Sequence, residues 1–62
     1  MNGYYAKLTE LLKAHGYWYD RPAKGSHELW TNGKRATTVP RNCQSRHTAN
    51  SILKQAGIDA KF

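Results

Sequence analysis

The sequence has few of the residues that stabilise small secreted proteins or hold metal ions. Its 62 residues include one cysteine, two prolines and only four acidic side chains. The lone cysteine, Cys43, allows no disulfide framework, which favours the reducing cytoplasm as the location. Cys43 and His47 have the spacing of a metal-binding pair, but two ligands do not complete a zinc site and no second pair follows. We therefore predict no metal and no cofactor.

Long hydrophobic runs and a signal peptide are also missing. No apolar stretch approaches the roughly 20 residues that span a bilayer, so we predict no membrane partner. Residues 1–5 lack the basic-then-apolar pattern of a secretory signal. The chain contains no glycine-rich phosphate loop, no Ser/His/Asp set and no clustered carboxylates, because its acids are scattered. Enzyme classes that depend on these motifs are therefore excluded.

Positive charge is what the sequence has in excess. Ten Lys and Arg against four Asp and Glu give a formal net charge of +6. A field of this sign in so short a chain favours a polyanionic partner, of which nucleic acid is the commonest. The basic residues are not gathered on one amphipathic helix, as they would be for a membrane surface. Solubility alone is the simpler explanation of the charge.

The chain is long enough for one domain, residues 1–62, with a thin core. Domains of this size bury only about 60% of their unfolded surface. Helical periodicity is present at residues 4–15, with Asn2 as the expected N-cap. A second helix is predicted to begin after Ser45 and to stop at Gly57.

Three segments between these helices have the composition of strands. Residues 17–21 are aromatic, while residues 26–31 and 34–39 flank Asn32-Gly33, the pair typical of a type I′ hairpin. The element order predicts an α+β fold, α-β-β-β-α, in which a three-stranded antiparallel sheet carries two helices on one face.

A two-residue hairpin loop fixes the pairing and the faces of the sheet. The predicted pairs are Thr31 with Lys34, Trp30 with Arg35, and His27 with Thr38. The more apolar face, which should meet the helices, carries Tyr17, Tyr19, Arg21, Trp30, Arg35, Thr37 and Val39. The opposite, open face carries His27, Leu29, Ala36 and Thr38. A one-residue slip or a bulge would reverse this assignment.

His27 is the strongest candidate for chemistry. The segment Lys24-Gly25-Ser26-His27 brings a histidine to the first position of a predicted strand, which would hold its ring in a fixed direction. Histidine exchanges protons near neutral pH. From the pattern alone, a structural strand histidine is the more frequent outcome. His15 is interpreted as a helix-capping residue and His47 as an exposed polar residue.

Cations near His27 suggest that it acts on a phosphodiester. The predicted RNA- or phosphate-binding residues are Arg21, Lys24, Ser26, Lys34, Arg35, Arg41 and Arg46. In RNA the ribose 2′-hydroxyl is an internal nucleophile, so a proton acceptor, a proton donor and cations would suffice without a metal. DNA lacks this hydroxyl and would not be cleaved.

Several motifs occur in an order that is typical of one protein family. They are His15-Gly16-Tyr17, Arg21, the segment from Lys24 to His27, Trp30, Val39-Pro40 and residues 51–58. Over nearly its whole length the chain thereby resembles the HicA family of bacterial toxin–antitoxin systems. The resemblance implies a fold similar to a double-stranded-RNA-binding domain. It also implies a ribosome-independent mRNA endoribonuclease whose catalytic histidine is His27.

The resemblance further implies a cognate HicB antitoxin that covers the active site. DNA binding would reside in that antitoxin, so we expect no specific DNA binding by this chain. The chain departs from the family at Asn42, because many members have a histidine two residues after the proline. Whether His47 takes part of that role stays open. Two alternative functions are a non-catalytic double-stranded-RNA-binding module and an accessory subunit that docks an acidic protein.

Overall fold

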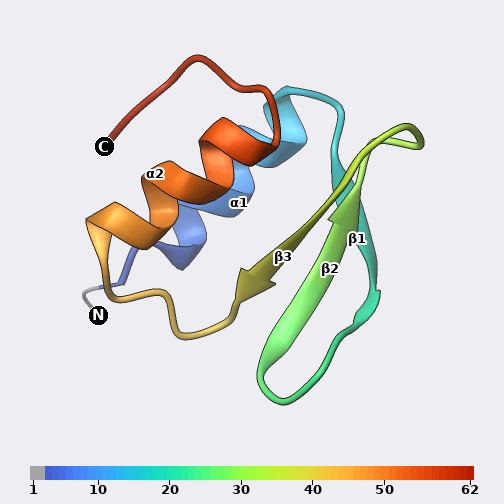
Figure 1. Ribbon diagram of the computed structural model, residues 1–62, viewed down its shortest axis with the longest axis horizontal. Helices are drawn as coiled ribbons and strands as arrows, with labels where there is room; N and C mark the ends of the chain where they lie inside the picture. The colour runs from blue at the N-terminus through green and yellow to red at the C-terminus, as the bar shows by residue number, and fades with distance from the viewer. Residues whose placement is uncertain (1–2) are drawn as a thin grey trace.

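The computed structural model describes residues 3–62, which form two helices and three strands in the predicted order α-β-β-β-α (Figure 1). The elements are α1 (Tyr5–Ala14), β1 (Trp18–Pro22), β2 (His27–Thr31), β3 (Ala36–Pro40) and α2 (Arg46–Gln55). The strands form one antiparallel sheet in the order β1-β2-β3. Both helices lie on the same side of this sheet, to its left in Figure 1. The predicted α+β fold class is confirmed.

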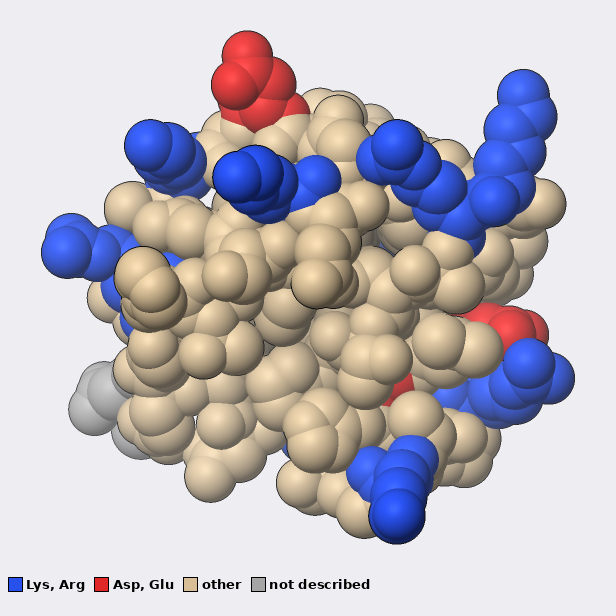
Figure 2. Space-filling model, in the orientation of Figure 1, with Lys and Arg blue, Asp and Glu red and all other residues tan. Residues whose placement is uncertain are grey.

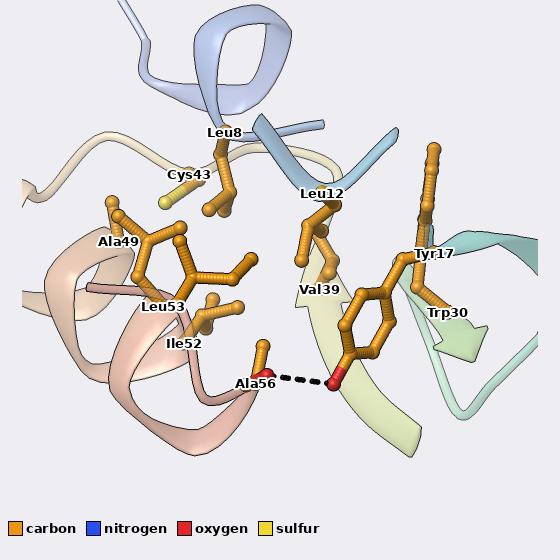
Figure 3. Packing of buried hydrophobic residues seen from close by; sticks show 11 residues of the cluster. Leu8, Leu12, Tyr17, Trp30, Val39, Cys43, Ala49, Ile52, Leu53 and Ala56 are labelled. Carbon is orange, nitrogen blue, oxygen red and sulfur yellow. Dashed lines mark hydrogen bonds between the residues drawn. The ribbon is translucent and has the colours of Figure 1, made fainter. Parts of the chain in front are cut away.

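The hydrophobic core fills the space between the helices and the sheet (Figure 3). Leu8 and Leu12 of α1 are fully buried against Leu53 of α2 and Val39 of β3. Burial of each such side chain contributes about 1.5–3 kcal/mol. Tyr17, just before β1, donates its hydroxyl proton to the Ala56 carbonyl at 2.8 Å. This bond ties the beginning of the sheet to the end of α2.

The helix ends agree in part with the prediction. Ser45 is the N-cap of α2, and its hydroxyl oxygen accepts from the backbone N–H of Thr48 at 3.3 Å. Tyr4 occupies the N-cap position of α1 without a side-chain bond. The expected cap, Asn2, lies outside the described residues. His15 caps the other end of α1, where its ring Nδ1 is 2.9 Å from the Leu11 carbonyl.

The β2–β3 hairpin has a longer loop than predicted, so the predicted pairs are wrong. The observed pairs are Thr31 with Ala36, Trp30 with Thr37, and His27 with Pro40. The side chain of Asn32 explains the change, because its Oδ1 accepts from the backbone N–H groups of Lys34 (2.9 Å) and Arg35 (2.7 Å). An Asn side chain that bonds the backbone ahead of it builds its own turn, which here spans residues 32–35.

The predicted faces of β2 and β3 nevertheless hold. The pairing moved by two residues, and a shift by an even number leaves each side chain on its face. The helix side carries Glu28 and Trp30 of β2 with Thr37 and Val39 of β3, all buried. The open side carries the exposed His27.

A bulge in β1 changes the face of Arg21. Tyr19 pairs with Trp30 and Arg21 pairs with Leu29, which leaves Asp20 as an extra residue. Strict alternation predicted Arg21 on the helix side with Tyr19. The extra residue instead places Arg21 opposite Leu29, on the open face that also carries His27.

Candidate active site around His27

His27 is the first residue of β2, and its side chain is exposed on the open face of the sheet. Its ring Nδ1 lies 3.1 Å from the Lys24 carbonyl oxygen. A carbonyl can only accept, so this hydrogen bond requires the ring proton on Nδ1. The neutral ring then carries its lone pair on Nε2. This arrangement leaves Nε2 as the atom that can accept a proton from a ligand.

The turn before His27 holds the ring in this direction. The backbone N–H of His27 donates to the Lys24 carbonyl at 3.3 Å, and the N–H of Arg41 donates to the Ser26 carbonyl at 2.9 Å. Gly25 adopts a φ of +65°, a conformation that residues with a Cβ rarely adopt. A Cβ at Gly25 would meet no atom within 4 Å, so the backbone conformation, and not the available space, requires glycine.

A shallow hollow surrounds the histidine ring. Its lining comes from the turn and the neighbouring strand β3: Ala23, Lys24, Gly25, Ser26, His27 and Thr38. Among these residues Lys24 carries the only permanent charge, which is positive. The hollow therefore combines a proton-accepting nitrogen with a cation, the combination that suits an anionic ligand.

Three of the predicted phosphate-binding residues lie on the side of His27. Lys24 and Ser26 belong to the turn, and Arg21 projects from the open face with its side chain 70% exposed. Arg21 also has a contact of 3.7 Å between its Nε and Asp20 Oδ2. This long, exposed ion pair constrains the guanidinium weakly.

The other four predicted residues are not brought to His27. Lys34 and Arg35 lie in the loop at the far end of β2, and Arg46 begins α2 (Figure 1). Arg35 donates from Nη1 to the Gln55 carbonyl at 3.3 Å, where a cation favours the end of α2. Arg41 directs its Nε to Glu28 Oε2 at 3.3 Å, on the helix side of the sheet.

Glu28 is a buried carboxylate that the sequence analysis did not single out. It is 8% exposed, and its Oε1 accepts from the Tyr5 hydroxyl (2.7 Å) and from Trp30 Nε1 (3.0 Å). Burial alone would raise the pKa of Glu28, but these two donors and Arg41 outweigh burial and hold the pKa below its usual value. Burial and the bond to Glu28 raise the pKa of Tyr5 to about 12.

The Glu28 cluster joins three parts of the molecule. Tyr5 comes from α1, Glu28 and Trp30 from β2, and Arg41 follows β3 directly. Since the Arg41 backbone also bonds the Ser26 carbonyl, the cluster is linked to the turn that holds His27. One signal in the sequence could have revealed Glu28, because it alternates with Trp30 on the apolar face of a predicted strand.

The family model for the HicA toxin of bacterial toxin–antitoxin systems matches residues 5–58, from the first residue of α1 to beyond the end of α2. The chain belongs to the HicA toxin family. Neither the curated proteins nor the solved structures give a match to it. As a HicA-family protein, the chain is the toxin of a toxin–antitoxin system, and a cognate antitoxin is its implied partner.

Asn42 is the residue at which the sequence departs from the histidine expected two residues after the proline. It follows Arg41 at the end of β3, close in the chain to Pro40, which pairs with His27. Its Oδ1 accepts from Gln44 Nε2 at 2.7 Å. Asn42 is exposed and can offer an amide, but no titratable group, to a ligand at this end of the sheet.

Cys43 and His47, which have the spacing of a metal-binding pair, lie in the core and on the surface of this HicA protein respectively. Cys43 is buried, and burial raises the pKa of its thiol, whereas His47 is exposed on α2. Within residues 3–62, no group of three or more His, Cys, Asp or Glu side chains could hold a metal ion. The helices of this same part of the chain are all too short and too polar to cross a membrane.

The positive charge of the HicA chain is dispersed on the face that Figure 2 shows. On the face shown in Figure 2, basic side chains project from the rim, several of them along the upper edge, and the centre carries little charge. The net charge of +6 thus gives general attraction to an anion. Selection of a particular phosphate has to come from local groups such as those around His27.

Proposed function

We propose that this HicA-family toxin is a metal-independent endoribonuclease that cleaves mRNA, with His27 as its general acid/base. The observation that carries the proposal is the 3.1 Å contact between His27 Nδ1 and the Lys24 carbonyl, which leaves Nε2 free at an exposed, positively charged hollow. Residues 1–62 would act as one toxin domain in the cytoplasm. The antitoxin would cover the His27 hollow, and specific DNA binding is not expected of this chain.

The proposed reaction uses the chemistry of RNA itself. Neutral Nε2 of His27 takes the proton of the ribose 2′-hydroxyl as that oxygen attacks the adjacent phosphorus. The bond from phosphorus to the 5′-oxygen breaks, that oxygen takes a proton from water as it leaves, and the protonated His27 returns its proton to water. The products are a 2′,3′-cyclic phosphate and a 5′-hydroxyl. Lys24 and Arg21 stabilise the extra negative charge on the phosphate during the attack.

Substitution of the histidine tests this proposal. We expect His27→Ala to abolish growth arrest and to lower cleavage of labelled mRNA by the purified protein about 100-fold or more, the usual effect of losing a general acid/base. The fold should persist, because the ring is exposed. His15→Ala removes an exposed histidine at the end of α1 and is the matched control, which should cleave as the unmodified protein does.

Three results would count against the proposal. Undiminished cleavage by folded His27→Ala protein would remove the histidine from the mechanism. Loss of cleavage in a metal chelator would contradict metal independence. Binding of RNA by the unmodified protein without any product would favour the non-catalytic double-stranded-RNA-binding module.

A further inference from the structure

Trp18 is an exposed tryptophan on the same face of the sheet as His27. It pairs with Thr31, which lies an even number of residues along β2 from His27, so the three side chains share the open face. Trp18 is 51% exposed. The tip of its ring rests beside the β2–β3 loop, 3.5 Å from where a Cβ on Gly33 would lie.

The surface between Trp18 and His27 can accommodate a chain of nucleotides. Thr31 is four residue steps along β2 from His27, a span of about 13 Å at about 3.3 Å per residue. The open face between the two rings carries Arg21, Leu29, Ala36 and Thr38. Arg21 lies opposite Leu29, midway along this span, and provides a cation for a phosphate.

Negative charge is nearly absent from this face. Glu28 points to the helices and is neutralised by Arg41. Asp20, in the bulge of β1, contacts Arg21 at 3.7 Å. The electrostatics of the open face therefore favour an anionic occupant, and a chain of phosphates is one such occupant.

The edge of β1 is poorly suited to adding a strand from a protein partner. A bulge at Asp20 and the proline at position 22 interrupt the row of backbone donors that such a strand would need. A ligand on this side of the sheet would therefore contact the ring of Trp18 and not its backbone. An exposed aromatic ring beside cations is the usual platform for an unpaired base.

We propose that the open face binds an unpaired RNA segment, with one base stacked on Trp18, a phosphate at Arg21 and the reacting phosphodiester at His27. This inference rests on the proposed RNA-cleaving function and specifies its substrate as single-stranded. Every base has a π-face that can stack on an indole, so the contact tolerates any sequence. In a duplex these faces are already stacked on neighbouring bases, so Trp18 selects against paired RNA.

Tryptophan fluorescence can follow this contact in the unmodified protein. The chain has two tryptophans, and Trp30 is only 3% exposed, so solvent-accessible emission comes from Trp18. The probe is a 2′-O-methyl oligonucleotide, which lacks the free hydroxyl needed for cleavage, used unpaired or annealed to its complement. We expect the unpaired probe to quench the emission and to bind about tenfold more tightly than the duplex.

Three substitutions at two adjacent residues provide the matched test. Trp18→Ala should weaken binding of the unpaired probe about tenfold, whereas Trp18→Phe should keep most of the affinity and lose the quenching. Tyr19→Ala is the control, because Tyr19 is 46% exposed but lies on the helix side, edge-to-face with Trp30. Its affinity for the probe should be unchanged.

The outcomes separate this inference from the proposed function. Equal binding of paired and unpaired probes, or unchanged affinity in Trp18→Ala, overturns the inference even if the unmodified protein cleaves RNA. So does a Trp18→Ala protein that keeps RNA affinity and loses only the antitoxin, which would make the ring a protein-docking site. Trp18-dependent binding without His27-dependent cleavage would instead overturn the proposed function and support this inference.

Discussion

At the scale of single residues, one buried hydroxyl stands out because it has no partner. Thr37 is 3% exposed, and its Oγ1 has no hydrogen-bond partner within residues 3–62. Burial of a hydroxyl without a compensating bond costs about 1–3 kcal/mol. Thr37→Val keeps the shape and replaces the hydroxyl by a methyl group. We expect it to raise the free energy of unfolding by about 1 kcal/mol in urea denaturation.

Its neighbour in β3 provides the comparison. Thr38 points to the open face and is exposed, so Thr38→Val should give no comparable gain. If Thr37→Val proved less stable than the unmodified protein, its hydroxyl would have to contribute a bond in solution.

Residue roles could be predicted only where they depend on nearby sequence. The face of His27 was predicted from strand alternation and the hairpin pairing, and it held because the pairing moved by an even number of residues. Arg35 and Arg41 were predicted to bind phosphate, but each has a partner far along the chain, Gln55 and Glu28. Such pairings depend on tertiary packing, which the spacing of charges in the sequence does not encode.

At the scale of elements, the strands and helices were predictable and their connections were not. Periodicity located the two helices, because burial on one face imposes it, and composition together with turn residues located the three strands. The predicted two-residue hairpin loop was wrong, because Asn32-Gly33 fits a longer loop as well. The side-chain bonds of Asn32 to the backbone of Lys34 and Arg35 select the longer loop. The bulge at Asp20 decides the face of Arg21, and no turn residue or pattern in the sequence indicates it.

The turn before His27 is the connection on which the proposed activity depends. Gly25 has a φ of +65°, so Gly25→Ala forces either strain of about 1–2 kcal/mol or a different turn. We expect Gly25→Ala to lower kcat about tenfold with little change in KM, since the ring is displaced while the cations remain. Labelled RNA with initial-rate kinetics measures both constants.

A second substitution at Gly25 distinguishes a changed direction of the His27 ring from a simple loss of folding stability. Asn tolerates the left-handed conformation better than other residues with a Cβ. Gly25→Asn should therefore recover much of the kcat that Gly25→Ala loses. Equal loss in both variants would show that the turn conformation is not what the activity requires.

At the scale of the whole molecule, the Glu28 cluster connects the helix layer to the sheet and to the active-site turn. The domain measures 29 × 27 × 15 Å, so its thin core leaves few contacts between layers. Tyr5 and Arg41 reach the same carboxylate from α1 and from the end of β3. Loss of charge at this one carboxylate should therefore be felt in the stability of the entire fold.

The pH dependence of stability tests this connection. Because the folded protein holds the pKa of Glu28 below 4.5, the unfolded chain binds this proton more readily than the folded one. The stability that Glu28 contributes is thus present above pH 4.5 and is lost as the pH falls through the folded pKa. Glu28→Gln should unfold with about 1–2 kcal/mol less free energy at neutral pH. It should also lose less stability on acidification than the unmodified protein, as measured by urea denaturation across the acid range.

Glu10→Gln, on the exposed side of α1, is the matched control and should keep the full acid dependence. If Glu28→Gln and the unmodified protein lost stability in parallel below pH 4.5, the cluster would not be what couples the layers.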